Sequence, residues 1–566
     1  MEDEEQSRHE LLQYFERVEG MLDSATFEDE ESKELFLGNV LEEIKGKEKR
    51  LACDLHCSRV LEKFISQALP ETLSTLLAAL APDFPDLLCN RYGSHVLQAA
   101  ISAIHRLDAN ESTSEETNGE DHLEHVESIR KYFLDLTQHL LDNLDESMRE
   151  TYSSHVFRSV ILCLAGLSLP TKMRAKSSRG YRDANNQRDS STTKAHPVPH
   201  QYSVCLDGAI KSIVEDSQLC DWIYHRTAGP CLQAFLKASA AVKNESCESL
   251  SKAILGTFNA DNAMAAAVCD ATASHVIDVC LELGSEEIIH DIFAGGFQGD
   301  LLDRAGHGIS NFVLQKLLQK AAVNDVSKMA DELCDNIEDV LAEAKASVVA
   351  ELINAAARCQ TRQEQVLKGL ATAFHFDWVE NVEEAALCLL SVSTLERWKE
   401  LQATEEGDKL HVRFTAIGCQ LVRALANMDA EYNQHIVMSL SRRSSEELLA
   451  MACHKNGSFA LQALFTSSAV GSKRKANLIS KLEGGFVRLA SNSFGSHIVD
   501  AAWSAATIKA KTAIANELVA AESQVKSAPQ GKFIWRNCKL DVFKHHRDEW
   551  WVVLVHAGIE TFDSEV

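Results

Sequence analysis

The side chains that could do chemistry recur in a six-residue motif. It holds a turn residue, a small polar residue, a flat or cationic residue, two apolar residues and a further polar residue. We number its positions from the small polar residue, so that Ser94, His95 and Gln98 are first, second and fifth. These groups can form hydrogen bonds and stack on a flat ligand, which indicates a binding face. Clear copies are Cys57-Ser-Arg-Val-Leu-Glu62, Gly93-Ser-His-Val-Leu-Gln98, Ser153-Ser-His-Val-Phe-Arg158, Ala228-Gly-Pro-Cys-Leu-Gln233, Ala273-Ser-His-Val-Ile-Asp278, Ser310-Asn-Phe-Val-Leu-Gln315, Gly457-Ser-Phe-Ala-Leu-Gln462 and Gly495-Ser-His-Ile-Val-Asp500.

The spacing of the motif predicts a repeat architecture. With three weaker copies at 346–351, 418–423 and 531–536, the first positions run from residue 58 to residue 532, and five of the ten steps lie close to 36 residues. A period of this size is typical of helical solenoids. One step of 72 residues predicts a degenerate unit near residues 375–395, and two other long steps coincide with polar insertions.

Helical periodicity places each motif on an amphipathic helix. Val96, Ala100 and Ile104 recur every four residues and form one apolar stripe. At 100° per residue, the first, second and fifth positions fall together on another face. We therefore expect each motif helix to pack with one face and to present three groups with the other. Ala/Leu-rich stretches such as residues 73–80 supply a second helix of each unit.

Charge divides the chain into segments. The formal net charge is −27, which argues against a uniformly basic nucleic-acid binder. We expect an acidic N-terminal segment at 1–32, a repeat array at 33–550 and a C-terminal tail at 551–566. Within the array we expect a disordered acidic insertion at about 107–126 and a flexible basic insertion at about 171–200, which could contact phosphate or lie idle in solvent.

Enzyme, metal and membrane functions find no support. The sequence has no phosphate-binding loop, zinc-protease motif or nucleophile elbow, and Cys53-Asp-Leu-His56-Cys57 lacks the paired spacing of zinc sites. We therefore expect no enzyme activity and no cofactor. No signal peptide or membrane helix is evident, and the 16 cysteines look like small buried hydrophobes, so we expect a soluble intracellular protein.

The motif resembles the pumilio-type RNA-binding repeats, in which each helical unit reads about one base. The resemblance covers roughly residues 35–550. Eleven units and the ending Gly531-Lys-Phe-Ile-Trp-Arg-Asn-Cys-Lys-Leu-Asp-Val-Phe543 look like the nucleolar protein 9 family of ribosome-biogenesis factors. The resemblance implies an all-α fold: a right-handed, strongly curved superhelical solenoid of about eleven pumilio-like (armadillo-like) repeats.

The resemblance also assigns roles by motif position: the first and fifth residues bond a base edge and the second stacks between bases. Ser58 with Glu62 then favours guanine, Ser94 with Gln98 and Ser458 with Gln462 favour adenine, and Asn311 with Gln315 favours uracil. Four fifth-position residues fall outside the usual code: Arg158, Asp278, Arg423 and Asp500. Gly229 and Pro230 offer no edge-reading group, and Val348 stands where a stacking residue is expected. The candidate RNA-binding residues are Ser58, Arg59, Glu62, Ser94, His95, Gln98, Ser154, His155, Arg158, Gln233, Ser274, His275, Asn311, Phe312, Gln315, Ser458, Phe459, Gln462, Ser496, His497, Asp500, Lys532 and Arg536.

Other interpretations of these residues stay open. The serines could simply begin helices, and the histidines could belong to the core. The function that the resemblance implies is binding of single-stranded or structured precursor ribosomal RNA on the concave repeat surface, regulating its processing in small-subunit biogenesis. The partners would be this RNA and pre-ribosomal assembly factors in the nucleolus, with no membrane or DNA. The alternative is a helical-repeat protein–protein scaffold, which the net negative charge favours.

Overall fold

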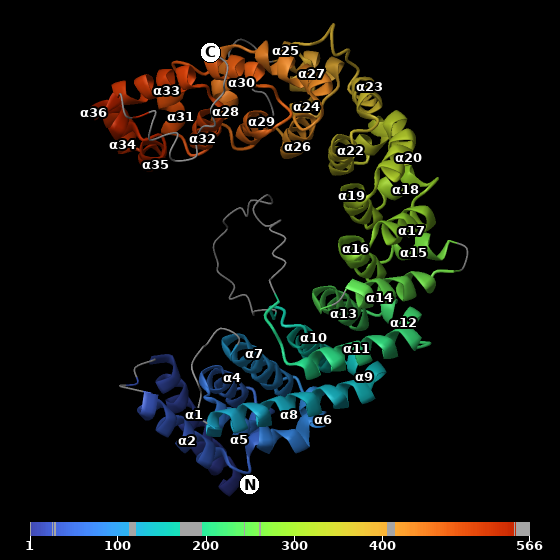
Figure 1. Ribbon diagram of the computed structural model, residues 1–566, viewed down its shortest axis with the longest axis vertical. Helices are drawn as coiled ribbons and strands as arrows, with labels where there is room; N and C mark the ends of the chain where they lie inside the picture. Colours follow the sequence, from blue (N-terminus) through green and yellow to red (C-terminus); the bar gives the residue numbers. More distant parts are fainter. Residues whose placement is uncertain are drawn as a thin grey trace. The chain divides into compact units, whose positions relative to one another are not determined.

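The structure is a computed structural model of the 566-residue chain. It describes residues 2–24, 27, 30–111, 120–169, 195–242, 244–259, 262–404, 414–547 and 550. All regular secondary structure within these residues is helical, which confirms the all-α fold (Figure 1). Contacts divide the chain into two compact units, Met1–Ile292 and Phe293–Val566, and the boundary falls within one helix, α17 (Glu286–Gly296).

In the described residues the helices form eleven sets of three: a short first helix, a motif helix and a third helix. The short helices are α3 (Glu48–Ala52), α6 (Phe84–Leu88), α9 (Leu144–Arg149), α12 (Leu219–Tyr224), α15 (Ala263–Ala267), α18 (Leu301–Gly306), α21 (Ile337–Ala342), α24 (Ala385–Ser391), α28 (Ser445–Ala452), α31 (Phe486–Ala490) and α34 (Glu522–Ser527). The motif helices are α4 (Cys57–Gln67), α7 (Gly93–Glu111), α10 (Thr151–Leu164), α13 (Ala228–Val242), α16 (Ala273–Leu283), α19 (Ser310–Lys320), α22 (Ala346–Cys359), α26 (Ala416–Leu425), α29 (Lys455–Thr466), α32 (Gly495–Ala505) and α35 (Pro529–Asn537).

The third helices complete the sets, and a few helices lie outside them. The third helices are α5 (Pro70–Leu80), α8 (Glu120–Asp142), α11 (His200–Glu215), α14 (Asn244–Gly256), α17, α20 (Val323–Leu333), α23 (Gln363–Ala373), α27 (Ala430–Ser441), α30 (Ser472–Lys481), α33 (Ile508–Ala520) and α36 (Leu540–His545). Outside the sets lie α1 (Glu2–Ser24), α2 (Glu30–Ile44), α25 (Leu395–Thr404) and the 3-10 turns η1 (Ala81–Asp83) and η2 (Cys334–Asn336).

Motif helices pack against one another in a row within each unit. In the first unit α4 contacts α7, α7 contacts α10, α10 contacts α13 and α13 contacts α16 (Figure 1). In the second unit the same row runs through α19, α22, α26, α29, α32 and α35. The apolar stripe expected on α7 is confirmed, because Val96, Ala100 and Ile104 are buried. Burial of each large apolar side chain stabilises the array by about 1.5–3 kcal/mol.

The glycine that precedes the first position allows the motif helix to start close to the short helix before it. A Cβ atom on Gly93, Gly457 or Gly495 would lie within 3.1 Å of the carbonyl oxygen six residues earlier. Real Cβ atoms hardly ever approach other atoms closer than about 3 Å, so a larger residue would push the two helices apart. In the repeats that have it, the motif glycine is thus required by the close packing of these two helices.

The expectation of a degenerate repeat near residues 375–395 is wrong. Gly418, in the first turn of α26, lies against the carbonyl of Leu390 at the end of α24, so α24 is the short helix of the eighth repeat. The motif helices α22 and α26 contact each other directly, with no motif helix between them. The described part of the extra residues forms a folded insertion instead, in which the backbone N–H of Leu395 donates to the carbonyl of Phe374 at 2.9 Å.

The two insertions are shorter than expected where the structure describes them. Residues 107–111 belong to α7 and residues 120–126 to α8, so the predicted disorder is wrong at these positions. His122 and His125 accordingly lie on a helix, and His125 Nδ1 lies 3.0 Å from Ser74 Oγ. Residues 112–119 and 170–194, which hold the middle of the acidic insertion and most of the basic one, lie outside the described residues.

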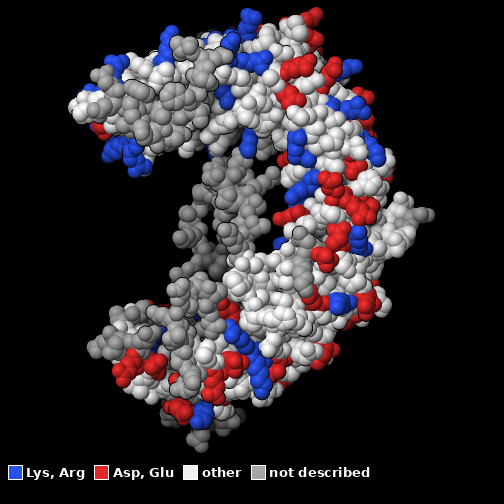
Figure 2. All heavy atoms as spheres, viewed as in Figure 1, with Lys and Arg blue, Asp and Glu red and all other residues white. Residues whose placement is uncertain are grey.

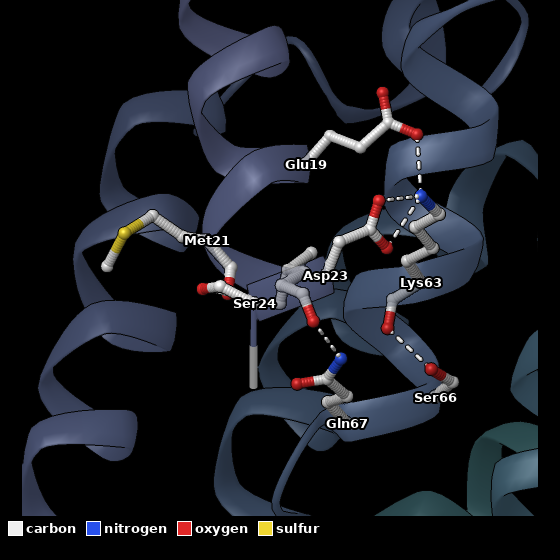
Figure 3. Close-up of polar contacts among 8 residues, drawn as sticks. Glu19, Met21, Asp23, Ser24, Lys63, Ser66 and Gln67 are labelled. Carbon is white, nitrogen blue, oxygen red and sulfur yellow. Dashed lines mark hydrogen bonds and ion pairs between the residues drawn. The ribbon is translucent and has the colours of Figure 1, made fainter. Parts of the chain in front are cut away.

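The acidic N-terminal segment contains a helix that packs on the first repeat. Phe15, Val18 and Leu22 of α1 are buried, and α1 contacts α4. Lys63 Nζ of α4 donates to Glu19 Oε1 at 2.6 Å and to Asp23 Oδ2 at 2.8 Å (Figure 3). Two acidic residues of this segment, Glu19 and Asp23, therefore help to hold α1 on α4 through their ion pairs with Lys63. The expected boundary at residues 32–33 falls inside α2.

The remaining expectations concern cysteines, the membrane and the C-terminus. All cysteines are free and nine are buried, but Cys89 and Cys220 are exposed, contrary to the expectation of uniform burial. No helix among the described residues is long and apolar enough to cross a membrane. The tail at 551–566 lies outside the described residues, the last of which is Trp550, buried beside Trp503 and Phe543.

Candidate nucleic-acid interface

The second motif position is the most exposed position of the motif in most repeats. Phe312 and Phe533 keep 64% and 59% of their surface, and the His275 side chain keeps 68%. Exposed flat rings of this kind are suited to stack on bases. The second positions are Arg59, His155, His275, Phe312, Gln420, His497 and Phe533, which are exposed, and His95, Pro230 and Phe459, which are half-buried. Core burial, the alternative for the histidines, is wrong for His155, His275 and His497.

First-position side chains are buried, so the expectation that they are presented with the others is wrong for nearly all repeats. The Ser154 hydroxyl donates to the carbonyl of Thr151 at 2.9 Å, and Ser94 and Ser496 make the same bond three residues back at 3.2 and 3.1 Å. The exceptions are Lys532, which is exposed, and Ser347, which is half-buried. The buried first positions with polar side chains are Ser58, Ser94, Ser154, Ser274, Asn311, Ser458 and Ser496. Whether these groups also contact a base stays a prediction.

Fifth-position side chains lie beside the second position on the helix surface, because residues three apart are neighbours. They are exposed or half-buried. Gln315 Nε2 donates to Asn311 Oδ1 at 3.2 Å, and His275 Nδ1 lies 3.8 Å from Asp278 Oδ2. The exposed fifth positions are Arg423 and Arg536, and the half-buried ones are Glu62, Gln98, Arg158, Gln233, Asp278, Gln315, Gln462 and Asp500.

Hydrogen bonds join the second and third repeats across the row. Gln98 Nε2 donates to the carbonyl of His155 at 3.2 Å, and Gln98 Oε1 lies 3.2 Å from His95 Nδ1. Arg158 bonds the His155 ring. Burial, and then the charges of Arg158 and His95, lower the pKa of His155, so its ring is neutral at neutral pH. A neutral ring is available for stacking here.

The last repeat pairs an exposed ring with a cation. The Arg536 guanidinium lies 5.6 Å from the centre of the Phe533 ring. Sequence reasoning selected Lys532 and Arg536 but missed Phe533, although it stands at the second motif position. It likewise missed Gln420, which is exposed at the second position of the eighth repeat. The spacing of the motif alone could have identified both residues.

The seventh repeat is shifted by one residue. Val348 is 1% exposed, whereas Ser347 and Glu351 are half-buried at the helix surface. The expectation that Val348 lies at the surface in place of a stacking residue is therefore wrong, because Ser347 occupies the surface position. A serine offers no ring, so this repeat has no stacking group.

Charged side chains of both signs lie on the visible face of the molecule. Figure 2 shows acidic and basic side chains interspersed over the visible face of the described residues. On α32, burial raises the pKa of Asp500, although Asn537 Nδ2 donates to its Oδ1 at 3.3 Å and opposes the shift. Among the described residues, no group of three or more His, Cys, Asp or Glu could hold a metal ion. The arrangement can therefore bind flat, polar ligands through stacking and edge contacts.

Known proteins share both the sequence and the fold. Residues 46–533 match the family described as the NOP9-like PUF repeat domain. Nucleolar protein 9 of Mus musculus is 28% identical and aligns over 96% of this chain and 88% of its own length. Pumilio homolog 23 of Arabidopsis thaliana is 25% identical over 96% of this chain and 72% of its own. The solved structure of APUM23-GGAAUUGACGG has a TM-score of 0.77 at 22% identity and covers 96% of this chain and 98% of that chain.

A row of helical repeats that presents stacking and edge-binding side chains defines the class of PUF-type RNA-binding repeat proteins. Within this class, the chain belongs to the NOP9-like PUF repeat family. Members of this family are RNA-binding proteins and not enzymes, and this chain has no catalytic function. Its relatives named Nucleolar protein 9 indicate a nuclear, nucleolar localisation.

Proposed function

We propose that the chain binds precursor ribosomal RNA through the second and fifth positions of its motif helices and regulates RNA processing in small-subunit biogenesis. The row of exposed second-position side chains is the observation that carries this proposal. Two similar proteins support it: one is named Nucleolar protein 9, and the other, APUM23, has a solved structure whose name contains the RNA sequence GGAAUUGACGG.

Each repeat contributes a small share of the binding free energy. Single-stranded bases would stack on His275, Phe312, Phe459 and the equivalent groups, at about 1–3 kcal/mol per base. Carboxamides such as Gln315 and Gln462 would bond base edges. Arg423 and Arg536, which are exposed at the fifth position, would contact phosphates. Specificity would then come from a few repeats, because several fifth positions depart from the usual code.

Quantitative RNA binding tests this proposal. The full-length chain and a His275→Ala/Phe312→Ala/Phe459→Ala variant are titrated with fragments that tile the precursor of the small-subunit ribosomal RNA. We expect the wild type to select a few fragments, with affinity that falls as salt rises. The variant should bind these fragments at least about 100-fold more weakly, because it loses three stacking groups. Equal affinity of the two proteins would contradict the assigned interface.

The protein scaffold is the second candidate, and the −27 net charge favours it. It predicts that partner proteins stay bound after RNase treatment and that the triple variant still binds them. Loss of all partners on RNase treatment would instead favour the RNA-binding proposal.

A further inference from the structure

The loop before the short helix of the eighth repeat carries an exposed apolar side chain. It spans residues 374–384, between α23 and α24, and lies within the second compact unit. Val379, near its middle, is 76% exposed, the highest value among the large apolar side chains of the described residues. Burial of such a side chain stabilises a protein by about 1.5–3 kcal/mol, and the fold forgoes this gain at Val379.

Hydrogen bonds and a buried ring hold Val379 in a defined position. Asp377 Oδ1 accepts from the backbone N–H groups of Val379 at 2.7 Å and Glu380 at 3.0 Å. The N–H of Asp377 in turn donates to Asn381 Oδ1 at 2.9 Å. The neighbouring Trp378 is buried, and its Nε1 donates to a carbonyl of α23 at 3.0 Å. The exposed side chain is therefore part of a preorganised surface, which lowers the entropic cost of binding a partner.

The loop follows α27, the third helix of the same repeat, which also contacts α24 (Figure 1). The Trp378 ring lies 5.6 Å from the His435 ring, and Glu383 Oε2 lies 3.9 Å from Arg443, just after the end of α27. One turn after His435, α27 carries a second exposed apolar side chain, Met438, at 47% exposure. Single exposed apolar residues are common, but here two of them lie on adjoining elements.

Carboxylates accompany this apolar pair. Residues 374–396 contain five acidic residues and no lysine or arginine. Three of the acidic residues, Asp377, Glu380 and Glu383, are exposed on the loop itself. The backbone N–H groups of Glu380 and Val379 lower the pKa of Asp377, so its carboxylate stays charged at neutral pH. The loop therefore combines an apolar contact with a negative rim.

This composition fits a basic protein segment better than a nucleic acid or a membrane. Carboxylates repel RNA phosphates, and the anionic surface of a membrane attracts basic rather than acidic protein surfaces. An apolar centre beside complementary charges is the usual composition of a protein–protein interface. The helix α27 carries none of the motif positions, so this surface is separate from the proposed RNA interface.

We propose that the 374–384 loop and α27 together form a docking surface for a basic segment of a partner protein. An apolar side chain of the partner covers Val379 and Met438, and lysine or arginine side chains pair with Glu380 and Glu383. The proposal goes beyond RNA binding and does not depend on it.

Selection from a library of random peptides displayed on phage tests this surface. The baits are the RNase-treated full-length wild type, an apolar variant Val379→Ser/Met438→Gln and a charge variant Glu380→Lys/Glu383→Lys. The best peptides are then synthesised and titrated against each protein by fluorescence anisotropy. Thermal unfolding shows whether each variant keeps the wild-type fold.

The matched control is Val323→Ser/Ile508→Gln. It changes two apolar side chains, 51% and 43% exposed, on the third helices α20 and α33. Wild type and control should enrich peptides that combine net positive charge with a large apolar residue. The apolar and charge variants should each bind the best peptide about tenfold more weakly or worse. Equal affinity of all four proteins, enrichment of acidic peptides, or no enrichment at all would overturn the proposal.

Two further measurements on the same variants identify another occupant if there is one. Loss of affinity for a precursor-RNA fragment in the apolar and charge variants would assign the surface to RNA. A wild-type dimer in analytical ultracentrifugation that the apolar variant does not form would assign it to a second copy of the chain. Either result would overturn the basic partner, whereas unchanged RNA affinity and a monomer in all variants are expected.

Discussion

At the scale of single residues, the first and second positions of the motif have different tasks. The first-position serine is buried, and its hydroxyl stabilises the start of the helix by donating to the backbone carbonyl three residues earlier, as Ser154 does to Thr151. The second-position side chain makes little contact with the rest of the protein when it is exposed, as Phe312 does at 64% exposure. Stability and ligand binding are therefore assigned to adjacent residues, and they can be changed separately.

Replacing Phe312 by Ala should weaken RNA binding and leave the fold unchanged. The ring is mostly exposed, so its removal leaves no cavity, but it removes a stacking contact of about 1–3 kcal/mol. The affinity for the best precursor-RNA fragment should fall about tenfold or more in a fluorescence-anisotropy titration. Ile508→Ala, which truncates a 43% exposed side chain on the third helix α33, is the matched control. Equal losses in the two variants would count against a stacking role.

Motif spacing alone identifies the exposed residues well and the buried ones poorly. It placed His275, Phe312 and His497 on the surface, and it extends without difficulty to Phe533, which is 59% exposed. It did not distinguish the buried Ser94 from the more exposed His95. The two side chains are 100° apart on the helix, and the sequence does not show how much of that arc the neighbouring helix covers. The shift in the seventh repeat was also hidden, since Ser347 and Val348 fit the motif in either register.

At the scale of helices, the repeat depends on a close approach between its short helix and its motif helix. Gly457→Ala should destabilise the protein, because its Cβ would lie 2.7 Å from the carbonyl oxygen of Met451. We expect a loss of about 1–3 kcal/mol in urea unfolding, the usual cost of overpacking. Gly208→Ala is the control, because nothing lies within 4 Å of its Cβ inside α11. It should stabilise its helix by about 0.5–1 kcal/mol. A neutral Gly457→Ala would contradict the packing argument.

The helix α1 should depend on apolar burial more than on its ion pairs. Phe15 is 2% exposed, and its replacement by Ala should cost about 3–5 kcal/mol and free α1 from α4. Lys63→Ala removes pairs between partly exposed groups, which are worth about 0–1 kcal/mol. Hydrogen exchange of the α1 amides should accelerate strongly in the first variant and slightly in the second. The reverse order would show that charge holds this helix.

Periodicity predicted the eleven repeats, but it misassigned the long step before α26. A step of two periods suggests a missing copy of the motif, because sequence spacing cannot distinguish a degenerate repeat from an insertion of equal length. The glycine contact resolved it: Gly418 meets Leu390 as Gly495 meets Leu489. This contact joins residues far apart in the sequence and becomes visible only when the chain is folded.

At the scale of the whole molecule, stability should fall as the solution becomes mildly acidic. Burial is the first cause that lowers the pKa of His105, His155, His225, His435 and His454 below the ordinary value of 6.5. The unfolded chain therefore binds protons on these groups at a higher pH than the folded chain does. Their contribution to stability is complete above about pH 6.5 and is lost progressively below it.

The thermal midpoint should accordingly be lower at about pH 5.5 than at about pH 7.5. His105→Gln should reduce this difference, because burial and the His196 ring, whose centre lies 4.5 Å from that of His105, lower the pKa of His105. Asp108 on the same helix opposes this shift without cancelling it. A midpoint that rises on acidification would contradict this account.

The net charge of −27 is compatible with RNA binding because acidic residues are concentrated away from the motif helices. Residues 1–50 contain 16 acidic and 7 basic residues, and residues 107–150 contain 13 and 3. Part of this charge is neutralised locally, as in the pairs of Lys63 with Glu19 and Asp23 (Figure 3). A polyanion that approaches the motif helices therefore meets a more balanced surface than the total charge indicates.

Crosslinking and sequencing of RNA bound in cells tests the central claim most directly. Wild type is compared with the His275→Ala/Phe312→Ala/Phe459→Ala variant, beside an RNase-treated control. We predict wild-type reads concentrated on one region of the small-subunit precursor ribosomal RNA and a loss of these reads in the variant. No enrichment over the control, with protein partners that survive RNase, would show that the repeats are a protein scaffold and that the motif positions do not bind RNA.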